Sequence, residues 1–238
     1  DIVPDLVALG ERALPVYLRA LRDHDLVVRR RVAQALHGMD PVPSQAAPAL
    51  IQSLDDKDRT VRVFAVEALA KIPSEVDKII PALIRSLGHK DDDFRHSLCH
   101  ALSGISKTVV VPAIAEALKD KRWRVREGAA RVLGQHGGWA WKYAPALISL
   151  LGDEQSEVRR TAVWAMGFMK SAHDDVVPAL VRALEDESPP VCKAAATSLG
   201  KFGTLARRAV PALIRASTDD DRDLRKSAVV ALCWIWPE

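Results

Sequence analysis

The sequence has few of the residues that build disulfide-linked or membrane-embedded proteins. Its 238 residues include three cysteines, Cys99, Cys192 and Cys233, an odd number that forms no CxxC motif. A disulfide framework is therefore disfavoured and a reducing compartment is favoured, so we expect a cytoplasmic location. Apolar runs such as 109–111 are far shorter than the roughly 20 residues that a membrane-spanning helix needs, and no membrane partner is expected.

Aromatic residues and excess charge of one sign are also scarce. Aromatic residues make up 5% of the chain, although six of them are tryptophan. The 34 basic residues nearly balance the 31 acidic ones, and a net charge of +3 is low for a protein that binds nucleic acid. The hydrophobic content of 48% is too high for a disordered chain. Because the chain begins at Asp1, we expect a processed product or a piece of a longer protein.

A short apolar segment led by proline recurs seven times. Successive prolines are 33 residues apart, except for one interval of 31 residues, and this regularity excludes chance. Such a period is typical of proteins built from stacked helical repeats. The seven prolines are Pro15, Pro48, Pro81, Pro112, Pro145, Pro178 and Pro211.

Each proline-led segment is followed by a second amphipathic segment. With the proline as position 0, apolar or small residues stand at positions 13, 17, 20 and 21. These positions fall within an arc of about 100° on a helix, so each repeat is predicted to be a pair of helices with proline in the opening turns of the first. Glycine near the end of the second helix is expected to stop it, at Gly104, Gly134, Gly167 and Gly200.

The fold class predicted from this pattern is all-α. We expect a single domain, 1–238, that begins with a partial helix at 1–12. The repeats are predicted near residues 13–45, 46–78, 79–109, 110–142, 143–175, 176–208 and 209–238.

Two charged positions mark the link between the paired helices. Aspartate stands at position 8 in six repeats, with His89 as the exception, and arginine at position 14 in six repeats, with Cys192 as the exception. An arginine at position 14 projects from the edge of the apolar arc toward a neighbouring repeat. We therefore predict a structural ladder of charge-assisted hydrogen bonds between repeats. Its members are Asp23, Arg29, Asp56, Arg62, Arg95, Asp120, Arg126, Asp153, Arg159, Asp186, Asp219 and Arg225.

Three stretches carry a family resemblance: PALIRSLGHKDDDFRHSLCHAL (81–102), PALISLLGDEQSEVRRTAVWAMG (145–167) and PALVRALEDESPPVCKAAATSLG (178–200). They resemble the short HEAT-like repeats named after phycobilisome lyases, and the similarity covers residues 13–236. The resemblance implies a right-handed α-α superhelix, a solenoid of about seven two-helix repeats whose second helices line the concave surface. The TPLHxA signature of ankyrin repeats and the W…LG…Y pattern of tetratricopeptide repeats are absent. The resemblance implies no single activity.

The side of each second helix opposite its apolar arc is the predicted binding surface. Positions 15, 16, 19 and 23 hold eight basic and two acidic residues among several aromatic rings. Aromatic rings beside arginine are typical of protein interfaces, although loops or first helices could instead cover them. We therefore predict a non-catalytic scaffold that binds an acidic or aromatic-bearing protein or peptide segment. The predicted contact residues are Arg30, Arg31, Phe64, His96, His100, Trp123, Arg131, Arg160, Trp164, Phe168, Lys193 and Lys201.

Other functions have weaker support in the sequence. Nucleic-acid binding through phosphate contacts is the alternative, and in a HEAT-like DNA glycosylase Trp123, Glu127 and Arg131 would be the candidate residues. A HEAT-like lyase that handles bilins is a further enzymatic alternative. No catalytic triad or phosphate-binding loop is present, so no enzyme activity and no cofactor are predicted. His96 and His100 are one helical turn apart, but a third ligand is missing from that face, so no metal site is predicted. HEAT-like deoxyhypusine hydroxylase relies on His-Glu pairs, which this sequence lacks.

The loops and the C-terminal end carry further aromatic residues. Trp139 and Trp141 are expected to cap the interface between repeats, with a projecting binding lip as the alternative. Ile235 and Trp236 are expected to be exposed because no following repeat covers them. End-to-end self-association through this end is therefore an expected mode of assembly.

Overall fold

The computed structural model describes residues 10–236. Most of the predicted partial helix at 1–12 lies outside the described residues. By its internal contacts the chain divides into two compact units, Asp1–Ala113 (unit 1) and Ile114–Glu238 (unit 2), and their boundary lies within α8 (Lys107–Ala117). No helix in residues 10–236 is both long and apolar enough to cross a membrane.

The fold is an all-α repeat solenoid, and residues 10–236 contain no strand. In unit 1 the first helices are α2 (Leu14–Ala20), α4 (Ala47–Ser53) and α6 (Val76–Ser86), and the second helices are α3 (Leu26–Gly38), α5 (Arg59–Ala70) and α7 (Asp92–Gly104). In unit 2 the first helices are α10 (Ala144–Ser149), α12 (His173–Ala183) and α14 (Val210–Ala216). Its second helices are α9 (Trp123–His136), α11 (Ser156–Met166), α13 (Pro189–Phe202) and α15 (Arg222–Ile235). Short 3-10 helices are η1 (Gly10–Ala13), η2 (Ser44–Ala46), η3 (Gly137–Tyr143), η4 (Leu150–Gly152), η5 (Lys170–Ala172) and η6 (Gly203–Ala209).

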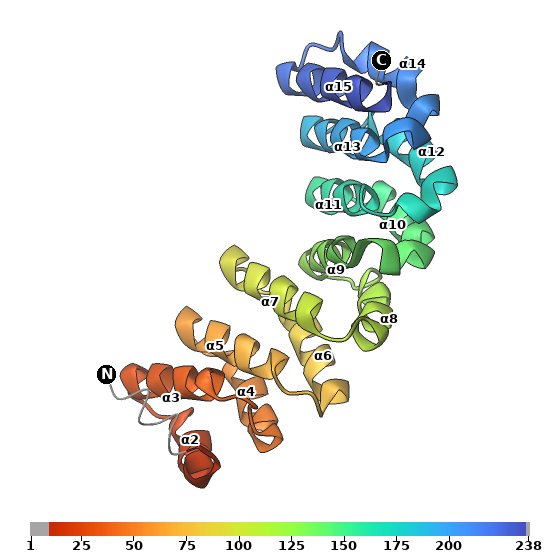
Figure 1. Ribbon diagram of the computed structural model, residues 1–238. Helices are drawn as coiled ribbons and strands as arrows, with labels where there is room; N and C mark the ends of the chain where they lie inside the picture. Colours follow the sequence, from red (N-terminus) through yellow and green to blue (C-terminus); the bar gives the residue numbers. More distant parts are fainter. Residues whose placement is uncertain (1–9, 237–238) are drawn as a thin grey trace. The chain divides into compact units, whose positions relative to one another are not determined.

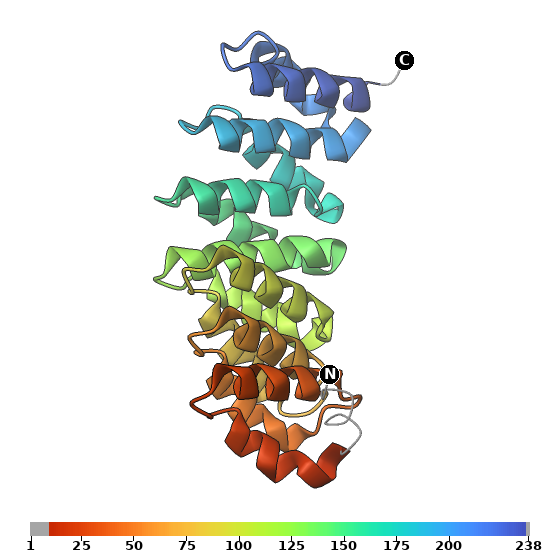
Figure 2. The ribbon, with the colours of Figure 1, turned by 90° about the vertical axis from the view of Figure 1, so that its left-hand side faces the viewer.

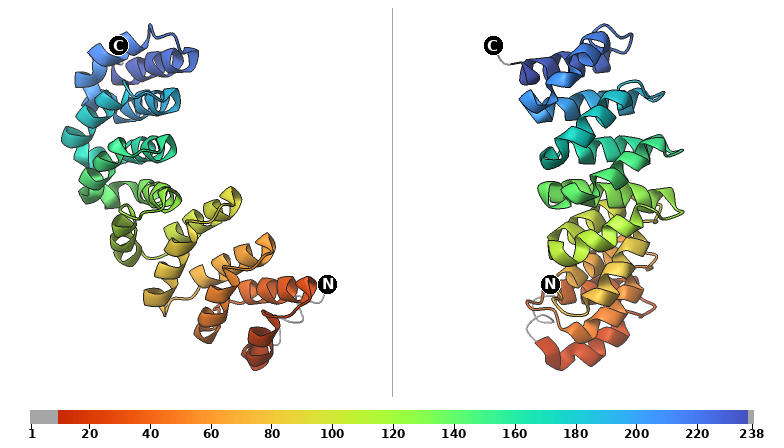
Figure 3. Two further views of the ribbon diagram at one scale, coloured as in Figure 1. Left: turned by 180° about the vertical axis from the view of Figure 1, so that it is seen from behind. Right: turned by 90° about the vertical axis from the view of Figure 1, so that its right-hand side faces the viewer.

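First and second helices form separate layers within each unit. In unit 2, α9, α11, α13 and α15 lie side by side, and α10, α12 and α14 form the layer behind them (Figures 1 and 2). In unit 1, α3, α5 and α7 form the same kind of layer, and α2, α4 and α6 lie beside it on one side (Figure 3, left). The side of each second-helix layer that points away from the first helices is called the second-helix face below.

The apolar arc of each second helix forms the core between the layers. In α11 the residues at positions 13, 17, 20 and 21 are Val158, Ala162, Ala165 and Met166, and each is 0% exposed. Burial of these side chains stabilises the stack by about 25 cal/mol for each Å² of apolar surface removed from water. The predicted periodicity therefore identifies the core.

Aspartates begin several of the second helices. The side chain of an aspartate just before the helix accepts a hydrogen bond from a first-turn amide in α3, α5, α7 and α15. This acceptor satisfies one of the amides that a helix start leaves unpaired.

The repeat prolines occupy two different places in the first helices. In α2, α4, α10 and α14 the proline lies within the first two residues, as predicted. Pro81, Pro112 and Pro178 instead lie inside α6, α8 and α12, deeper than predicted. These helices begin earlier because buried residues precede the proline, such as Ile79 and Ile80 (1% and 2% exposed), and their packing offsets the lost hydrogen bond.

Glycines end second helices, but not always the glycines predicted. Gly104 is the last residue of α7 and Gly167 follows α11 directly, whereas α9 and α13 continue past Gly134 and Gly200. The residues that end α9 and α13 are Gly137 and Gly203, whose φ angles of 50° and 56° suit glycine. The predicted stop at Gly134 and Gly200 is therefore wrong.

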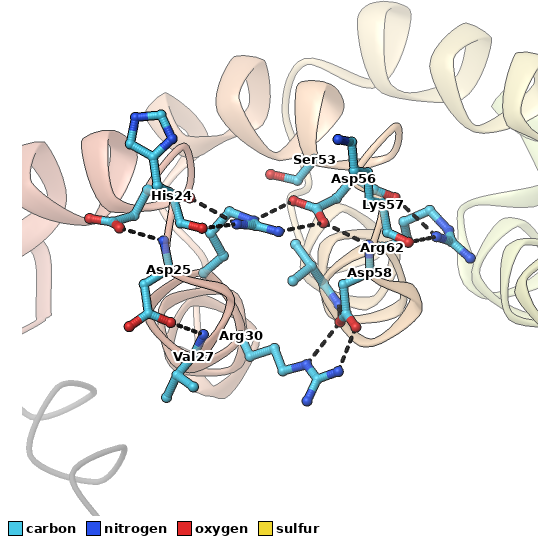
Figure 4. A network of polar contacts seen from close by, with 12 residues as sticks. His24, Asp25, Val27, Arg30, Ser53, Asp56, Lys57, Asp58 and Arg62 are labelled. Carbon is cyan, nitrogen blue, oxygen red and sulfur yellow. Dashed lines mark hydrogen bonds and ion pairs between the residues drawn. The ribbon is translucent and has the colours of Figure 1, made fainter.

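The turn between paired helices repeats one hydrogen-bond pattern. The position-8 carboxylate accepts a hydrogen bond from the amide two residues later, as Asp56 does from Asp58 (2.8 Å). The position-14 arginine donates back to the turn carbonyls, as Arg62 does to Asp56 O (2.9 Å) and Lys57 O (3.1 Å). These two sets of bonds fix the turn from both sides, and Figure 4 shows them around Asp56.

The other edge of the same arginine bonds to the next repeat. Arg29 Nε lies 2.8 Å from Asp56, Arg126 Nε 2.6 Å from Asp153, and Arg159 Nε 2.8 Å from Asp186. In each of these pairs a second guanidinium nitrogen bonds to the other carboxylate oxygen. Bidentate pairs of this kind fix geometry as well as contributing energy.

Members of the predicted ladder differ where the sequence departs from the pattern. Where His89 replaces the turn aspartate, Arg62 binds Asp91 instead (2.6 Å). His89 Nδ1 accepts the hydrogen bond of the Asp91 amide (3.0 Å), as the aspartate does in other turns. Arg95 pairs with Asp92, and Asp120 with Arg122, each within its own repeat. The side chains of Asp23 and Asp219 each accept a hydrogen bond from the backbone amide two residues later. Arg225 donates hydrogen bonds to two backbone carbonyls of its own turn.

Arginine in place of Cys192 is expected to bond to Asp219 and to stabilise the protein. Cys192 Sγ already donates to Asp186 O (3.0 Å), the kind of turn carbonyl that arginine uses elsewhere. We expect Cys192→Arg to raise the free energy of unfolding by about 1–2 kcal/mol, measured by urea denaturation.

Two controls separate the charge from the added bulk. Cys192→Met supplies length without charge and is expected to give no gain. In an Asp219→Ala background, Cys192→Arg is expected to lose its advantage, and an equal gain in both backgrounds would contradict the proposed rung.

Candidate binding face

The structure divides the predicted contact residues between exposed and half-buried positions of the second-helix face. Exposed members are Arg30, His96, His100, Arg160, Phe168 and Lys193, and half-buried members are Arg31, Phe64, Trp123, Arg131, Trp164 and Lys201. Glu127, Gly128 and Thr161 share these helix positions but are buried, so the expectation that they are exposed is wrong. They are buried because α9 and α11 approach closely, and Thr161 Oγ1 donates to Glu127 across this contact (3.0 Å).

An aromatic–lysine cluster crosses from α11 to α13. The rings of Trp164 and Phe168 meet edge to face with centroids 4.9 Å apart. Lys201 Nζ lies 3.7 Å from the centroid of Phe168 and 6.0 Å from that of Trp164. Burial lowers the pKa of the Lys201 ammonium from its ordinary value. The cluster therefore presents two rings and a partly desolvated cation on one surface.

The Trp164 ring packs against α9 at Gly134, where the two helices approach closely. A Cβ added to Gly134 would lie 2.5 Å from the Trp164 ring and 2.9 Å from Ala165, so no larger residue fits there without movement. On the same helix, Arg131 pairs with the buried carboxylate of Glu127. The arginine is therefore held in a fixed position on α9 by this carboxylate.

A pocket continues this surface onto α15. It has a volume of about 160 Å³ and is lined by Thr197, Gly200, Lys226, Val230 and Trp234, together with Ser227 and Ala231. The Trp234 ring forms one wall, packed over Gly200, and is 55% exposed. We call Arg131, Trp164, Phe168, Lys201 and Trp234 the binding strip.

Carboxylates neutralise part of the basic character of the second-helix face. Arg30 binds Asp58 through Nε (3.0 Å) and Nη2 (2.5 Å), which Figure 4 shows, and Lys193 binds Asp223 (2.8 Å). With the Arg131–Glu127 pair, at least three of the eight basic residues counted from the sequence have carboxylate partners. These pairs leave less charge for a polyanion than the sequence suggested.

Phe64 lies in a smaller cluster on unit 1. Its ring lies 5.6 Å from that of His37, and His37 Nδ1 is 3.5 Å from a Glu67 oxygen. Lys71 Nζ donates to the His37 carbonyl (2.6 Å). Desolvation, aided by the Lys71 charge, lowers the pKa of His37. This cluster ties α3 to α5 and exposes less aromatic surface than the binding strip.

The remaining candidates form no shared centre. His96 Nδ1 lies 2.8 Å from the Asp92 carbonyl oxygen, and no group of three or more metal-binding side chains occurs in the described residues. The Arg124 guanidinium lies over the Trp123 ring, with its Cζ atom 4.4 Å from the ring centroid. Trp139 and Trp141 are 64% and 52% exposed, so the expectation that they cap a repeat interface is wrong.

An open cleft of about 470 Å³ lies along the turns of the first two repeats and was missed from the sequence. His24, Arg29, Gln52, Asp56 and Lys57 are among its lining residues (Figure 4). The cleft arises from turn geometry, which residue periodicity does not reveal. Its charges bond to one another, as Arg29 does to Asp56, so it suggests no particular ligand.

Comparison with known proteins identifies repeats of one kind along most of the chain. The sequence matches the family described as HEAT repeats over residues 80–140 and 144–233. The match is to HEAT repeats in general, and the phycobilisome-lyase type stays a prediction. Among curated proteins no match is found.

Solved structures share the fold at low sequence identity. A structure of Kap95p with RanGDP is 20% identical with a TM-score of 0.73, over 98% of this chain and 37% of that chain. A structure of importin beta is 15% identical with a TM-score of 0.72, over 98% and 39%. An engineered protein is 24% identical with a TM-score of 0.52, over 98% and 70%. This chain thus spans little more than a third of the two natural proteins, and the likeness concerns the fold alone.

Loss of the Asp58 charge is expected to destabilise the protein in a pH-dependent way. The hydrogen bond from Arg30 is the main cause that lowers the Asp58 pKa from 3.8 to about 2. The folded state therefore favours the carboxylate, and this contribution is present above about pH 4 and lost as the pH falls toward 2. We expect Asp58→Asn, which keeps a helix cap, to lower the free energy of unfolding at pH 7 by about 1–2 kcal/mol.

Urea denaturation at pH 7 and at pH 2 checks this expectation. The difference between Asp58→Asn and the parent should shrink toward zero at the lower pH. Asp25→Asn alters a comparable cap at α3, bonded to the Val27 amide, and serves as the control for capping alone. If Asp58→Asn lowered the free energy of unfolding equally at both pH values, an electrostatic role for Asp58 would be contradicted.

Proposed function

Because the chain belongs to the HEAT repeat family, we propose that it is a non-catalytic scaffold that holds a protein segment on the second-helix face of unit 2. The single observation that carries this proposal is the binding strip, in which aromatic rings stay exposed beside cations. Phe168 is 40% exposed and Trp234 is 55% exposed, on a layer whose other large apolar residues are mostly buried. Aromatic residues on a preformed surface contribute strongly to protein binding.

The chemistry of the strip favours a partner segment with acidic and apolar side chains. Lys201 and the exposed Arg160 lie on the same face as Trp164 and suit a carboxylate. The pocket of about 160 Å³ beside Trp234 suits one apolar or aromatic side chain. An extended segment across α9, α11, α13 and α15 would meet these groups in succession.

The structural likeness supports use as a scaffold without naming a partner. Kap95p, which shares the fold, binds RanGDP, and this is a property of that protein. Nucleic-acid binding is the weaker proposal, since carboxylates hold Arg30, Arg131 and Lys193.

A peptide library tests the proposed partner chemistry. We expect immobilised protein to retain peptides that combine Asp or Glu with Phe, Trp or Leu, in preference to matched peptides with Lys or Arg. Combined Trp164→Ala and Arg160→Ala substitution is expected to weaken the best peptide by about 30-fold or more, measured by fluorescence anisotropy.

A matched control removes an exposed ring and a cation of η3 that are not members of the binding strip. Trp141→Ala with Lys142→Ala is expected to leave the affinity unchanged. Equal losses in the two double variants, or none in either, would contradict the strip as the binding site. Tight binding of duplex DNA with a steep dependence on salt would favour the nucleic-acid alternative.

A further inference from the structure

The loops between the repeats of unit 2 expose large apolar side chains. At the C-terminal end Ile235 is 0% exposed, so the expectation that it lies uncovered is wrong, whereas Trp236 is 65% exposed. Within the chain, Trp139 and Trp141 on η3 are 64% and 52% exposed, which supports the alternative expectation of a projecting lip. The η3 loop contacts η5 and is followed by α10 to α15, so the exposure of its rings does not depend on where the sequence ends.

The η6 loop repeats the form of η3. Each is a seven-residue 3-10 segment that begins at a glycine with positive φ, Gly137 (50°) in η3 and Gly203 (56°) in η6. Three residues later each loop has an alanine, Ala140 or Ala206, that is 0% exposed. The η3 loop contacts α9 and α10, and η6 contacts α13 and α14. The backbone of both loops is therefore anchored on the helices at either side.

The residues beside the buried alanine are exposed in both loops. An apolar side chain precedes the alanine, and a second ring or a cation follows it, with a further cation at the next position. The residues of this surface, called the loop edge below, are Trp139, Trp141, Lys142, Leu205, Arg207 and Arg208. Two loops of the same form thus direct apolar groups and cations outward.

The loop edge lies at the C-terminal ends of the second helices of unit 2. These helices are side by side and run in the same direction, so the loops that follow them lie on one edge of the unit, at the right in Figure 2. Neighbouring helices in such a stack are about 8–10 Å apart, so η3 and η6, which follow α9 and α13, are roughly 20 Å apart. The two loops can therefore contact one extended surface.

Charge differs between this edge and the opposite edge of unit 2. The turns at 152–155, 185–188 and 218–221 on the opposite edge contain aspartate and glutamate but no lysine or arginine. On the loop edge, no ion pair within residues 10–236 joins Lys142, Arg207 or Arg208 to a carboxylate. The exposed Asp174 and Asp175 at the start of α12 reduce this positive charge without cancelling it. An anionic surface is therefore attracted to the loop edge and repelled by the turns.

Projecting rings beside cations suit a lipid surface. An indole ring has an apolar body and a polar N–H, and it favours the boundary between lipid headgroups and acyl chains. Lysine and arginine next to it are attracted to anionic headgroups. A protein partner would need hollows shaped for two rings that are more than half exposed, whereas a fluid lipid surface accepts them without matched shape. The lack of a spanning segment led us to expect no membrane partner, but a peripheral contact needs no such segment.

We propose that the loop edge of unit 2 docks peripherally on an anionic lipid surface, with its three apolar side chains at the headgroup–acyl boundary and its three cations against the headgroups. This contact is separate from the binding strip, which lies on the second-helix face. Either surface can therefore be removed without the other.

Vesicle sedimentation tests the proposal with the full chain. We expect at least about tenfold tighter binding to vesicles of phosphatidylcholine with phosphatidylserine than to vesicles of phosphatidylcholine alone. Combined Trp139→Ala and Trp141→Ala substitution is expected to weaken binding by about tenfold or more, because apolar area no longer enters the interface. Combined Arg207→Gln and Arg208→Gln substitution is expected to weaken it by about tenfold.

Two further variants have different expected signs. Asp175→Asn removes an exposed carboxylate next to the edge and is expected to strengthen vesicle binding by about threefold. Trp164→Ala with Arg160→Ala removes a ring and a cation of the second-helix face and is expected to leave it unchanged. Circular dichroism confirms that each variant is folded.

Fluorescence quenching by lipids with brominated acyl chains separates insertion of the rings from simple adhesion. The parent is expected to be quenched, and the Trp139→Ala, Trp141→Ala variant is expected to lose most of this quenching.

Four outcomes would overturn the proposal. The absence of binding to anionic vesicles would remove the lipid surface, and equal binding to neutral vesicles would remove the role of the cations. Binding that survives both double substitutions on the loop edge would place the contact elsewhere. A polyglutamate peptide that binds the parent, loses affinity with Arg207→Gln and Arg208→Gln, and is bound where vesicles are not, would assign the edge to an acidic protein.

Discussion

The guanidinium of the position-14 arginine is bonded on two sides, and the order of the stack depends on it. Arg159 Nη1 reaches the carbonyls of its own turn, and its Nε and Nη2 reach Asp186 of the next repeat. The Arg159 side chain is only 8% exposed, so the attraction between Arg159 and Asp186 is strengthened by the lower local dielectric. Water cannot easily replace either partner. One side chain therefore fixes a turn and the neighbouring repeat together. This register determines which positions of the second helices lie outside.

The binding strip depends on that register. Trp164 remains on the second-helix face because α9 and α11 are held close enough for its ring to pack over Gly134. Lys201 then reaches Phe168 across the next helix contact. The ladder is similar in several repeats, whereas the residues at positions 19 and 23 differ, so we infer that these positions determine which partner is bound.

Period and residue type predicted most of the fold but only part of the site. The recurrent proline, aspartate and arginine indicate two-helix repeats because each type returns at a fixed place in the period and has a local role in a helix or a turn. The second role of the arginine, its bond to the next repeat, was predicted only in outline. Burial of Glu127 and Thr161 was not predicted, since it depends on how closely α9 and α11 approach. That distance is set by Gly134, which the sequence pattern suggested as a helix stop. Likewise, Ile235 is buried because α15 continues to this residue, and the helix directs its side chain toward the core.

The most direct test of this account is a double-mutant cycle on Arg126 and Asp153, a pair whose carboxylate is 6% exposed. Arg126→Met, Asp153→Leu and the combined variant are compared with the parent by urea denaturation. The account predicts a coupling free energy of about 1.5–3 kcal/mol between the two side chains. A coupling near zero, with all variants folded, would contradict the role of the arginine in setting the register.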